Sequence, residues 1–405
     1  MNAPDDRPFV RQYPELGTGP LPIEPMVSPD YFELERERIF KKTWLNVGRV
    51  EDIPRNGDYM VKEIAILQTA LVVVRGDDGV IRAFHNVCRH RGNQVAQGCG
   101  NTKGFACGFH GWTYDTRGAL VNVPDEEQFF GIDTRQLGLP AVHCDLFAGF
   151  IFINADPGPV QPLADYLGGL GDQIRDFPFD QMIPMHRVEA DVRVNWKVMI
   201  DAFQESYHGA FVHRLSVGDM IDPHSDDPYM HLSSARLFGP HRSASVPMNP
   251  NYQAQRRPAE ALSFKHASSL WLQEGSQERH FLPGTNPQRH DFWLFDINVC
   301  FPNFFIDVAN GWFFTYHFWP VAVDHTFWQY RFYMFPPADP AEMISREYAK
   351  VALRDLLRED LSTVEATQRG LASGAIREVY LSDQEIAVRH QYEVVDQMIR
   401  GARVA

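Results

Sequence analysis

Two short stretches of this chain each offer one thiol and one imidazole, and together they constrain the fold more than any other feature. The first is Cys88-x-His90, and the second, after sixteen intervening residues, is Cys107-x-x-His110. Two cysteines and two histidines can hold a tetrahedral zinc ion, or a [2Fe–2S] cluster with the cysteines on one iron and the histidines on the other. Zinc fingers keep the two cysteines together and the two histidines together. Each stretch here is mixed, which favours the iron–sulfur cluster.

The four residues and their flanking His-Arg-Gly and His-Gly-Trp boxes resemble a Rieske centre. The Rieske proteins of cytochrome bc complexes carry one more cysteine in each loop, and these two form a disulfide beside the cluster. The corresponding positions here hold Asn93 and Phe109, which cannot form that bridge. We therefore expect a potential at the low end of the Rieske range, about −150 mV, which suits electron transfer to an iron that activates oxygen.

Charge and cysteine usage limit the partners and the compartment. The net charge of −14 argues against nucleic acid and against an anionic membrane surface as partners. No apolar run is long enough to span a membrane, and the first residues do not resemble a signal peptide. Beside the cluster ligands, Cys99, Cys144 and Cys300 remain, and an odd number of thiols without an export signal indicates a reducing compartment. We expect a cytoplasmic protein.

The length of 405 residues suggests two or three domains. Residues 44–157 alternate short apolar runs with turn signals, so we expect a small all-β domain around the cluster. An N-terminal arm and a helix that Ser28 caps are expected over residues 1–43. The strands of the all-β domain are expected at residues 44–47, 64–74, 80–84 and 149–154, with a hairpin turn at 76–79.

Residues 158–405 have a mixed pattern, with three late segments that alternate strictly between apolar and other residues. Such alternation predicts an antiparallel sheet with one apolar face, most of it core and a small part of it pocket lining. We further expect a strand at 188–195, a helix from Trp196, a long helix at about 340–371 and a last helix at 383–400; residues 219–291 show no clear period. The alternating residues are Trp293, Phe295, Ile297, Val299 and Phe301; Trp312, Phe314, Tyr316 and Phe318; and Trp328, Tyr330, Phe332 and Met334.

A second metal site is indicated by His208 and His213. On a regular helix these two side chains would point about 140° apart, so they can share one metal only if the helix distorts or ends near Gly209. A cluster that only carries electrons needs an acceptor, and two histidines plus one carboxylate form the facial triad of non-haem Fe(II) oxygenases.

The combination resembles the α subunit of Rieske non-haem iron ring-hydroxylating oxygenases over nearly the whole chain. The resemblance includes the Asn-Trp-Lys stretch at 195–197 and the acid-x-x-His-x₄-His element at 205–213. It implies an α+β protein: an N-terminal all-β Rieske domain over residues 44–157 and a C-terminal helix-grip catalytic domain with an antiparallel sheet over residues 158–405.

The third iron ligand in the family is an aspartate of the late long helix. With about 100° per residue and Leu353 at zero, the apolar residues of this helix cover an arc from about −60° to +80°, and Asp360 falls at about −20°. A lone carboxylate on a buried face is costly unless it is paired or bound to metal. The other acids of this helix fall outside the arc and are expected to be solvated; they are Asp355, Glu359 and Glu365.

The resemblance also implies how electrons travel. The family forms a head-to-tail trimer in which the cluster of one subunit docks beside the mononuclear iron of its neighbour. Glu205, three residues before His208, corresponds to the acid that bridges to the cluster ligand, here His110, of the next subunit. Asp201 stands where aromatic dioxygenases often have Asn and is a candidate to support the iron ligands without binding the metal itself. Electrons would come from a reductase, usually through a ferredoxin; the sequence leaves open whether a β subunit is present.

The expected activity is insertion of oxygen from O₂ into an aromatic or other hydrophobic ring compound. One alternative is a Rieske monooxygenase that removes an N-methyl group from a quaternary ammonium compound, or an O-methyl group, since the late aromatic residues could equally hold a cation. A second alternative is an electron carrier that has the cluster but no catalytic iron.

Overall fold

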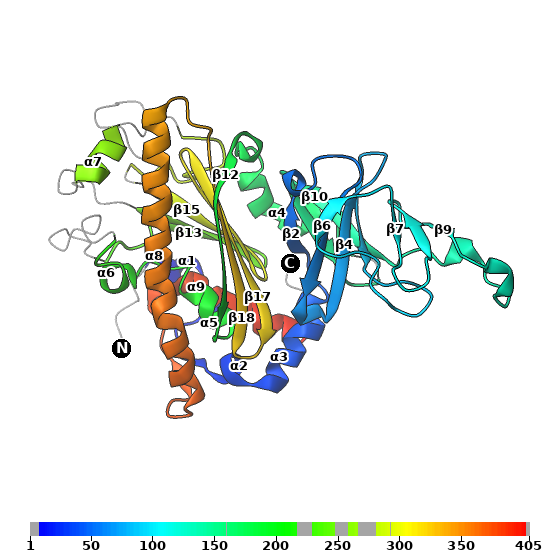
Figure 1. The fold of residues 1–405 in the computed structure, drawn as a ribbon. Helices are drawn as coiled ribbons and strands as arrows, with labels where there is room; N and C mark the ends of the chain where they lie inside the picture. The colour runs from blue at the N-terminus through cyan, green and yellow to red at the C-terminus, as the bar shows by residue number, and fades with distance from the viewer. Residues whose placement is uncertain are drawn as a thin grey trace. The chain divides into compact units, whose positions relative to one another are not determined.

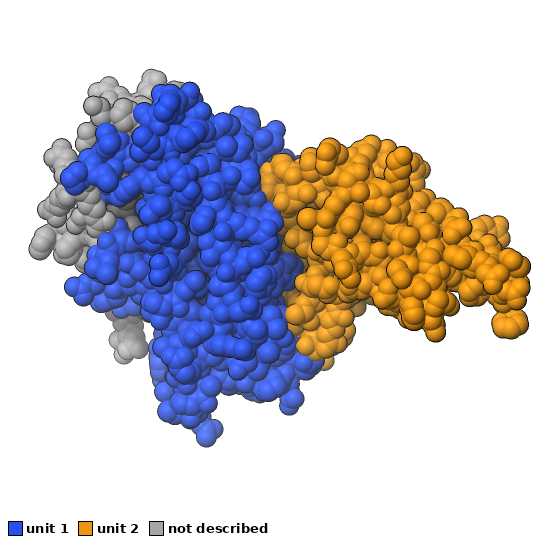
Figure 2. Space-filling view, viewed as in Figure 1, with its two compact units in different colours: residues 1–35, 167–405 blue, residues 36–166 orange. Residues whose placement is uncertain are grey.

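The computed structural model describes residues 8–158, 160–216, 229–247, 258–265, 281–291 and 293–401. The chain divides into two compact units: unit 1 comprises residues 1–35 and 167–405, and unit 2 comprises residues 36–166 (Figure 2). The domain boundaries expected from the sequence, after residues 43 and 157, refer to independently folding domains and stay predictions.

Unit 2 is built from antiparallel strands, as the sequence predicts. Its larger sheet has the order β2-β11-β10-β5-β4-β3-β6, and its smaller sheet has the order β7-β8-β9. The first cluster stretch follows β5, and the second lies in the connection between β7 and β8. The strands are β2 (Leu45–Arg49), β3 (Asp58–Ile64), β4 (Thr69–Arg75), β5 (Ile81–His85), β6 (Cys99–Asn101), β7 (Gly104–Ala106), β8 (Thr113–Asp115), β9 (Leu120–Asn122), β10 (Ala141–Phe147) and β11 (Phe150–Asn154).

The strand predicted at 64–74 is confirmed only from Thr69 onward, because the chain reverses direction after Ile64. A 3₁₀ turn over Ala65–Leu67 and a left-handed Gln68 (φ 52°) join β3 to β4, which then pair antiparallel. Ile66 and Leu67 are buried in the turn, so the apolar run continues through the reversal. The turn therefore cannot be recognised from the spacing of apolar residues. The hairpin turn predicted at 76–79 is confirmed, with Gly79 at φ 79° and the Gly76 N–H donating to the Val80 carbonyl.

Among the residues described, unit 1 contains a large antiparallel sheet of order β12-β18-β17-β16-β15-β14-β13 and a small one in which β1 (Leu21–Pro22) pairs with β19 (Glu378–Val379). The long helix α8 runs across the large sheet (Figure 1), which confirms the predicted α+β class. The strands are β12 (Ile183–Val192), β13 (Ser234–Phe238), β14 (His241–Pro247), β15 (Trp293–Cys300), β16 (Phe304–Ala309), β17 (Trp312–Ala322) and β18 (His325–Met334). The helices are α1 (Pro8–Gln12), α2 (Glu24–Val27), α3 (Pro29–Glu35), α5 (Trp196–Asp201), α6 (Gly209–Val212), α7 (Pro258–Lys265), α8 (Pro340–Ala372) and α9 (Ile386–Ile399), while α4 (Leu163–Ile174) crosses the boundary between the units.

The sheet differs from the prediction in that its central strands are buried on both faces. β16 and the first half of β17 have no exposed residue, and Phe313, on the face opposite the alternating aromatics, packs edge-on against Phe179 at 5.0 Å. A strand buried on both faces has no polar side from which alternation can be read. β16 was missed for this reason.

The start of each key helix is fixed by a side-chain cap. Asp339 accepts hydrogen bonds from the backbone N–H groups of Ala341 and Glu342, and Pro340 occupies the first position of α8. Asn195 caps α5 by accepting from the N–H of Lys197, so the strand predicted to reach residue 195 ends at Val192 instead. The predicted cap Ser28 accepts from the N–H of Tyr31 at the start of α3. Caps of this kind stabilise a helix by about 1 kcal/mol.

No helix within the described part of the chain is both long enough and apolar enough to cross a membrane.

Candidate metal centres

The two predicted cluster stretches of unit 2 fold into matching loops. The N–H of Cys88 donates to the carbonyl of Asn93, and that of Cys107 donates to the carbonyl of Trp112. In each loop the glycine four residues after the cysteine, Gly92 or Gly111, donates back to that cysteine carbonyl. Both glycines have positive φ, 81° and 73°, which a residue with a Cβ adopts only at a cost.

These loops bring the four predicted ligands together. Cys88 and Cys107 are both buried, and their thiols lie within hydrogen-bonding reach of each other. The rings of His90 and His110 are 4.5 Å apart, and both histidines are partly exposed. The structure therefore places the two cysteines inward and the two histidines toward the surface.

Donors around the sulfurs suit a thiolate-ligated cluster. The Tyr114 hydroxyl lies 3.4 Å from Cys88 Sγ, and the Asn93 amide lies 3.6 Å from Cys107 Sγ. Burial alone would raise the pKa of the Cys107 thiol, but the backbone N–H of Phe109 and the Asn93 amide outweigh it and lower the pKa. The buried Nδ1 of His90 has no hydrogen-bond partner in the part of the chain that the structure describes. An unpaired buried nitrogen costs free energy, and a metal ion would remove that cost.

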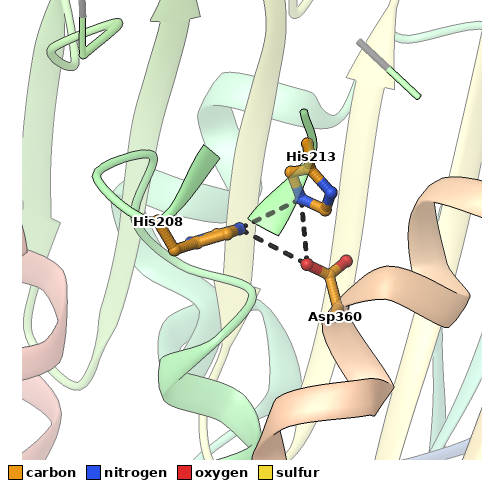
Figure 3. A group of neighbouring side chains, drawn as sticks. All are labelled: His208, His213 and Asp360. Atoms are coloured by element: carbon orange, nitrogen blue, oxygen red, sulfur yellow. Dashed lines mark hydrogen bonds and ion pairs between the residues drawn. The ribbon is translucent and has the colours of Figure 1, made fainter. Parts of the chain in front are cut away.

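In unit 1, His208, His213 and Asp360 converge on one point (Figure 3). His208 Nε2 lies 3.2 Å from His213 Nε2, and Asp360 Oδ1 lies 2.9 Å from His213 Nε2 and 3.4 Å from His208 Nε2. Asp360 Oδ1 is buried and makes no hydrogen bond of acceptable geometry with the described residues. Two imidazoles and one carboxylate that face a common centre fit a divalent iron with open positions.

A break in the helix brings the two histidines onto one side, as the sequence argument requires. α5 ends at Asp201, and a single short turn, α6, separates His208 before it from His213 after it. Because the two residues flank this turn rather than sit on one regular helix, the 140° separation does not apply.

The predicted burial of Asp360 on the apolar face of α8 is confirmed. Asp360 is 4% exposed and lies on the same buried face of α8 as Leu357 and Val364. Asp355 is half-exposed and pairs with its neighbour Arg354.

Glu359 is not the solvated acid that the sequence led us to expect. Its Oε2 lies 3.0 Å from His213 Nδ1 and also accepts a hydrogen bond from the Ser216 hydroxyl. The helical arc measures only the direction in which a side chain leaves the helix, and the longer glutamate reaches round to the outer nitrogen of the imidazole. A histidine already suspected as a ligand was the signal that could have revealed this partner.

Glu205 is bonded to His208. Its carboxylate contacts His208 Nδ1 and accepts from the His208 backbone N–H at 3.2 Å. Burial lowers the pKa of His208, but Asp360 and Glu205 outweigh it and raise the pKa to about 10. The negative potential that these two carboxylates create also favours a metal cation.

Asp201 lies in a different network. It accepts from the Tyr392 hydroxyl at 2.8 Å and from the Gln204 amide at 3.1 Å, and burial raises its pKa to about 7. None of its hydrogen bonds within the described residues reaches His208, His213 or Asp360.

A cavity of about 170 Å³ opens beside the three converging side chains. One wall is formed by α8, through Leu353 and Leu356, and the opposite wall by the sheet. Part of the predicted aromatic face therefore lines a pocket, as expected. The sheet residues that line it are Val246, Leu294, Phe295, Ile297, Asp307, Trp312, Phe314 and Tyr316.

Two protein-family models match the chain. The model described as ring hydroxylating alpha subunit (catalytic domain) matches residues 179–401, and the model described as Rieske [2Fe-2S] domain matches residues 43–142. The three converging residues lie in the first match, and the four residues of the matching loops lie in the second.

Curated relatives include two kinds of enzyme. The carnitine monooxygenase oxygenase subunit of Escherichia coli (strain K12) is 28% identical over 369 residues, 88% of this chain and 85% of that subunit. The biphenyl 2,3-dioxygenase subunit alpha of Rhodococcus jostii (strain RHA1) is 35% identical over 210 residues, 48% of this chain and 44% of that subunit.

Solved structures share the fold over almost the full length. A quaternary ammonium Rieske monooxygenase aligns with a TM-score of 0.76 at 20% identity, covering 95% of this chain and 97% of that one. Naphthalene 1,2-dioxygenase from Rhodococcus sp. bound to indole aligns with a TM-score of 0.75 at 22% identity, covering 98% and 99%.

Proposed function

Since this chain belongs to the family of Rieske ring-hydroxylating α subunits, we propose that His208, His213 and Asp360 hold its catalytic iron and that the adjoining cavity seats a small substrate with a hydrophobic body. The protein is a Rieske-type oxygenase, and its cofactors are a [2Fe–2S] cluster and a mononuclear iron. The observation that carries the proposal is the convergence at the cavity of two imidazole nitrogens and one buried carboxylate oxygen, which lies 2.9 and 3.4 Å from them.

Each residue at the centre has a separate task. When bound, the iron supplies open positions where O₂ is activated beside the substrate. Glu205 and Glu359 accept from the Nδ1–H groups of His208 and His213, which leaves the lone pair of each imidazole on Nε2, facing Asp360. Leu353, Leu356 and the aromatic wall keep bulk water away from the reacting atoms.

The four residues of the matching loops, Cys88, His90, Cys107 and His110, hold the cluster in this proposal. Electrons enter from a redox partner, which the family requires; the proposed donor is a reductase acting through a ferredoxin. The proposed assembly is a head-to-tail homotrimer in which Glu205 links His208 to His110 of the next subunit. The bond between Glu205 and His208 supports the first half of this route. The proposed compartment is the cytoplasm, in keeping with five cysteines that form no disulfide.

Two substrate classes remain, and each has an observation in its favour. The apolar walls of the cavity favour a hydrophobic ring, the class expected from the sequence. One carboxyl group in the same wall, that of Asp307, favours a substrate with a charged nitrogen. The third reading, an electron carrier without catalytic iron, is set aside because the family is that of the catalytic subunit.

Iron analysis tests the proposed ligands. The wild-type protein should hold about three irons per chain, and Asp360→Ala about two, with an unchanged cluster spectrum and no oxygen-dependent product. Asp355→Ala is the matched control: it removes an exposed carboxylate five residues earlier on α8 and should behave like the wild type. A third iron retained by Asp360→Ala would refute the ligand assignment.

A further inference from the structure

The sheet side of the cavity contains a single carboxyl group among the residues described. Asp307, on β16, lies in a wall that is otherwise aliphatic or aromatic, and it is 2% exposed. In the strand register it stands directly opposite Phe314 of β17, on the same face of the sheet. Its side chain therefore belongs to the lining of the substrate cavity.

The described residues leave this carboxyl group incompletely paired. Asp307 Oδ1 accepts one long hydrogen bond, 3.3 Å, from the backbone N–H of Asn298. That bond fills a gap in the β15–β16 ladder between the pairs Asp296–Val308 and Val299–Phe305. For Oδ2 the described part of the chain provides no hydrogen-bond donor. A buried carboxylate without a cationic or hydrogen-bonding partner is costly.

Electrostatics shows what kind of partner is missing. Burial raises the pKa of Asp307 well above its usual range; the Asn298 N–H opposes this rise, and the Asp296 charge adds to it. A positive charge inside the cavity would offset both the desolvation and the repulsion from Asp296. A neutral guest would offset neither.

Aromatic rings near Asp307 can also bind a positively charged group of the guest. Trp312 and Phe314 stack with centroids 5.0 Å apart, and Phe295 lies 5.9 Å from Trp312. Ring faces attract an ammonium group, and the attraction strengthens when the group is desolvated. A carboxylate and ring faces around one point form a site for a methylated ammonium group with an apolar body.

The charged site and the iron site belong to one cavity. The pKa of the Tyr316 phenol is raised first by burial and then by the charges of Asp307, Tyr330 and Asp360. Tyr316 and the three iron-site residues all line the same cavity as Asp307. A guest whose nitrogen is held at Asp307 thus has its remaining atoms within the space beside the iron ligands.

We propose that Asp307 is the specificity-determining residue of this oxygenase and selects substrates that carry a positively charged nitrogen on a small apolar body. The inference rests on the proposed function for the location of the reacting atoms, but it concerns binding alone. A purely structural Asp307, kept to bond the Asn298 N–H, is the competing explanation, and it predicts no preference for charge.

Calorimetric titration of the iron- and cluster-loaded wild type with two isosteric probes tests the charge preference directly. The probes are choline and 3,3-dimethylbutan-1-ol, which differ in having nitrogen or carbon at the centre of the trimethyl head. Choline should bind at least tenfold more tightly than the neutral alcohol. Equal affinities, tighter binding of the alcohol, or no choline binding at millimolar concentration would overturn the proposal.

Two variants separate charge from structure. Asp307→Asn keeps an oxygen for the Asn298 N–H but removes the charge, so choline binding should weaken about tenfold while the alcohol changes less than twofold. Tyr316→Phe removes a hydroxyl group from the same wall without changing its charge and should keep the preference for choline. A preference that survives in Asp307→Asn would show that this residue is structural.

The same preparations keep the two proposals distinguishable. Iron content and oxygen-dependent turnover of Asp360→Ala report on the iron ligands and do not depend on Asp307. The affinity ratio of the two probes reports on Asp307 and requires no turnover. A protein that lacked the third iron yet preferred choline would refute the proposed function alone.

Discussion

Two adjacent acidic residues of α8 contact the two ring nitrogens of His213. Asp360 Oδ1 faces His213 Nε2, and Glu359 Oε2 contacts His213 Nδ1. The first residue is proposed to bind the iron, and the second orients the histidine that binds it. The side chains of adjacent helical residues point about 100° apart, so Glu359 and Asp360 can contact the His213 ring from two directions.

We predict that Glu359→Ala weakens iron binding about 10- to 100-fold, the usual effect of removing a carboxylate that orients a metal-binding histidine. Glu359→Gln, which can still accept from Nδ1–H, should recover part of the loss. Ferrous iron affinity, measured by competition with a chelator, gives the comparison, and Asp355→Ala serves as the control. If Glu359→Ala bound iron as the wild type does, the contact with His213 would have no functional weight.

At the level of secondary-structure elements, α3 and α5 are joined by a buried ion pair. Lys197 Nζ lies 2.5 Å from Glu35 Oε1, the Trp196 indole N–H donates to Glu35 Oε2 at 2.8 Å, and the Glu35 and Lys197 side chains are fully buried. The Asn-Trp-Lys stretch noted in the sequence therefore has a structural explanation. Asn195 caps the helix, and the next two residues satisfy one glutamate of α3.

We predict that Lys197→Met destabilises the protein by about 3–5 kcal/mol, because it leaves the Glu35 carboxylate buried without a counter-charge. The double variant Glu35→Gln/Lys197→Met should regain most of this loss, since the amide oxygen still accepts from Trp196. Urea unfolding followed by circular dichroism measures both. A double variant no more stable than the single one would contradict the explanation.

Elements with a periodic sequence were predictable, and those that bury polar residues were not. α8 and the alternating strands β15, β17 and β18 follow from apolar spacing alone. β14 does not, because its buried positions include His241, Arg242 and Ser243, which read as a loop. Arg242 donates there to the side chains of Gln204 and Gln391, which come from distant segments of the chain and cannot be inferred from the local sequence. Other parts of the unassigned region 219–291 lie outside the described residues.

The same contrast holds for the site. Cys88, His90, Cys107, His110, His208, His213 and Asp360 were chosen from the sequence, because metal ligands carry a distinctive chemistry at a distinctive spacing. Asp307 was not, since an aspartate in an aromatic strand becomes informative only when its opposite neighbour is known to be Phe314. Substrate specificity depends on which residues become neighbours in the folded protein, and these neighbours cannot be read from the sequence.

At the scale of the whole molecule, the proposed electron route runs between subunits, and mixed assemblies can test it. Cys107→Ser should lack the cluster but bind the catalytic iron, and Asp360→Ala should do the opposite. Each alone should be inactive. In a head-to-tail ring of three, every mixed assembly contains one interface with an intact cluster facing an intact iron, so each mixed assembly should show about one third of wild-type activity.

A variant of Glu205 tests the same electron route. Glu205→Gln should keep the iron content and a reducible cluster, but single-turnover oxidation of the cluster by O₂ with substrate present should slow markedly. Mixed assemblies as inactive as their parents would mean that electrons do not cross between subunits. Wild-type rates in Glu205→Gln would remove that residue from the route.

Unit 2 is an insertion within unit 1, and this arrangement imposes an order on biosynthesis. β1 (Leu21–Pro22) pairs with β19 (Glu378–Val379), so Leu21 must wait for Val379, 358 positions later, before its strand partner exists. At roughly 5–20 residues per second, a ribosome needs about 20–70 s to synthesise that interval. Unit 2, whose residues 36–166 emerge well before, can fold and accept its iron and sulfide while the surrounding unit is still incomplete. A nascent chain can therefore complete the fold around its four cluster ligands before Asp360, the third residue of the iron site, has been synthesised.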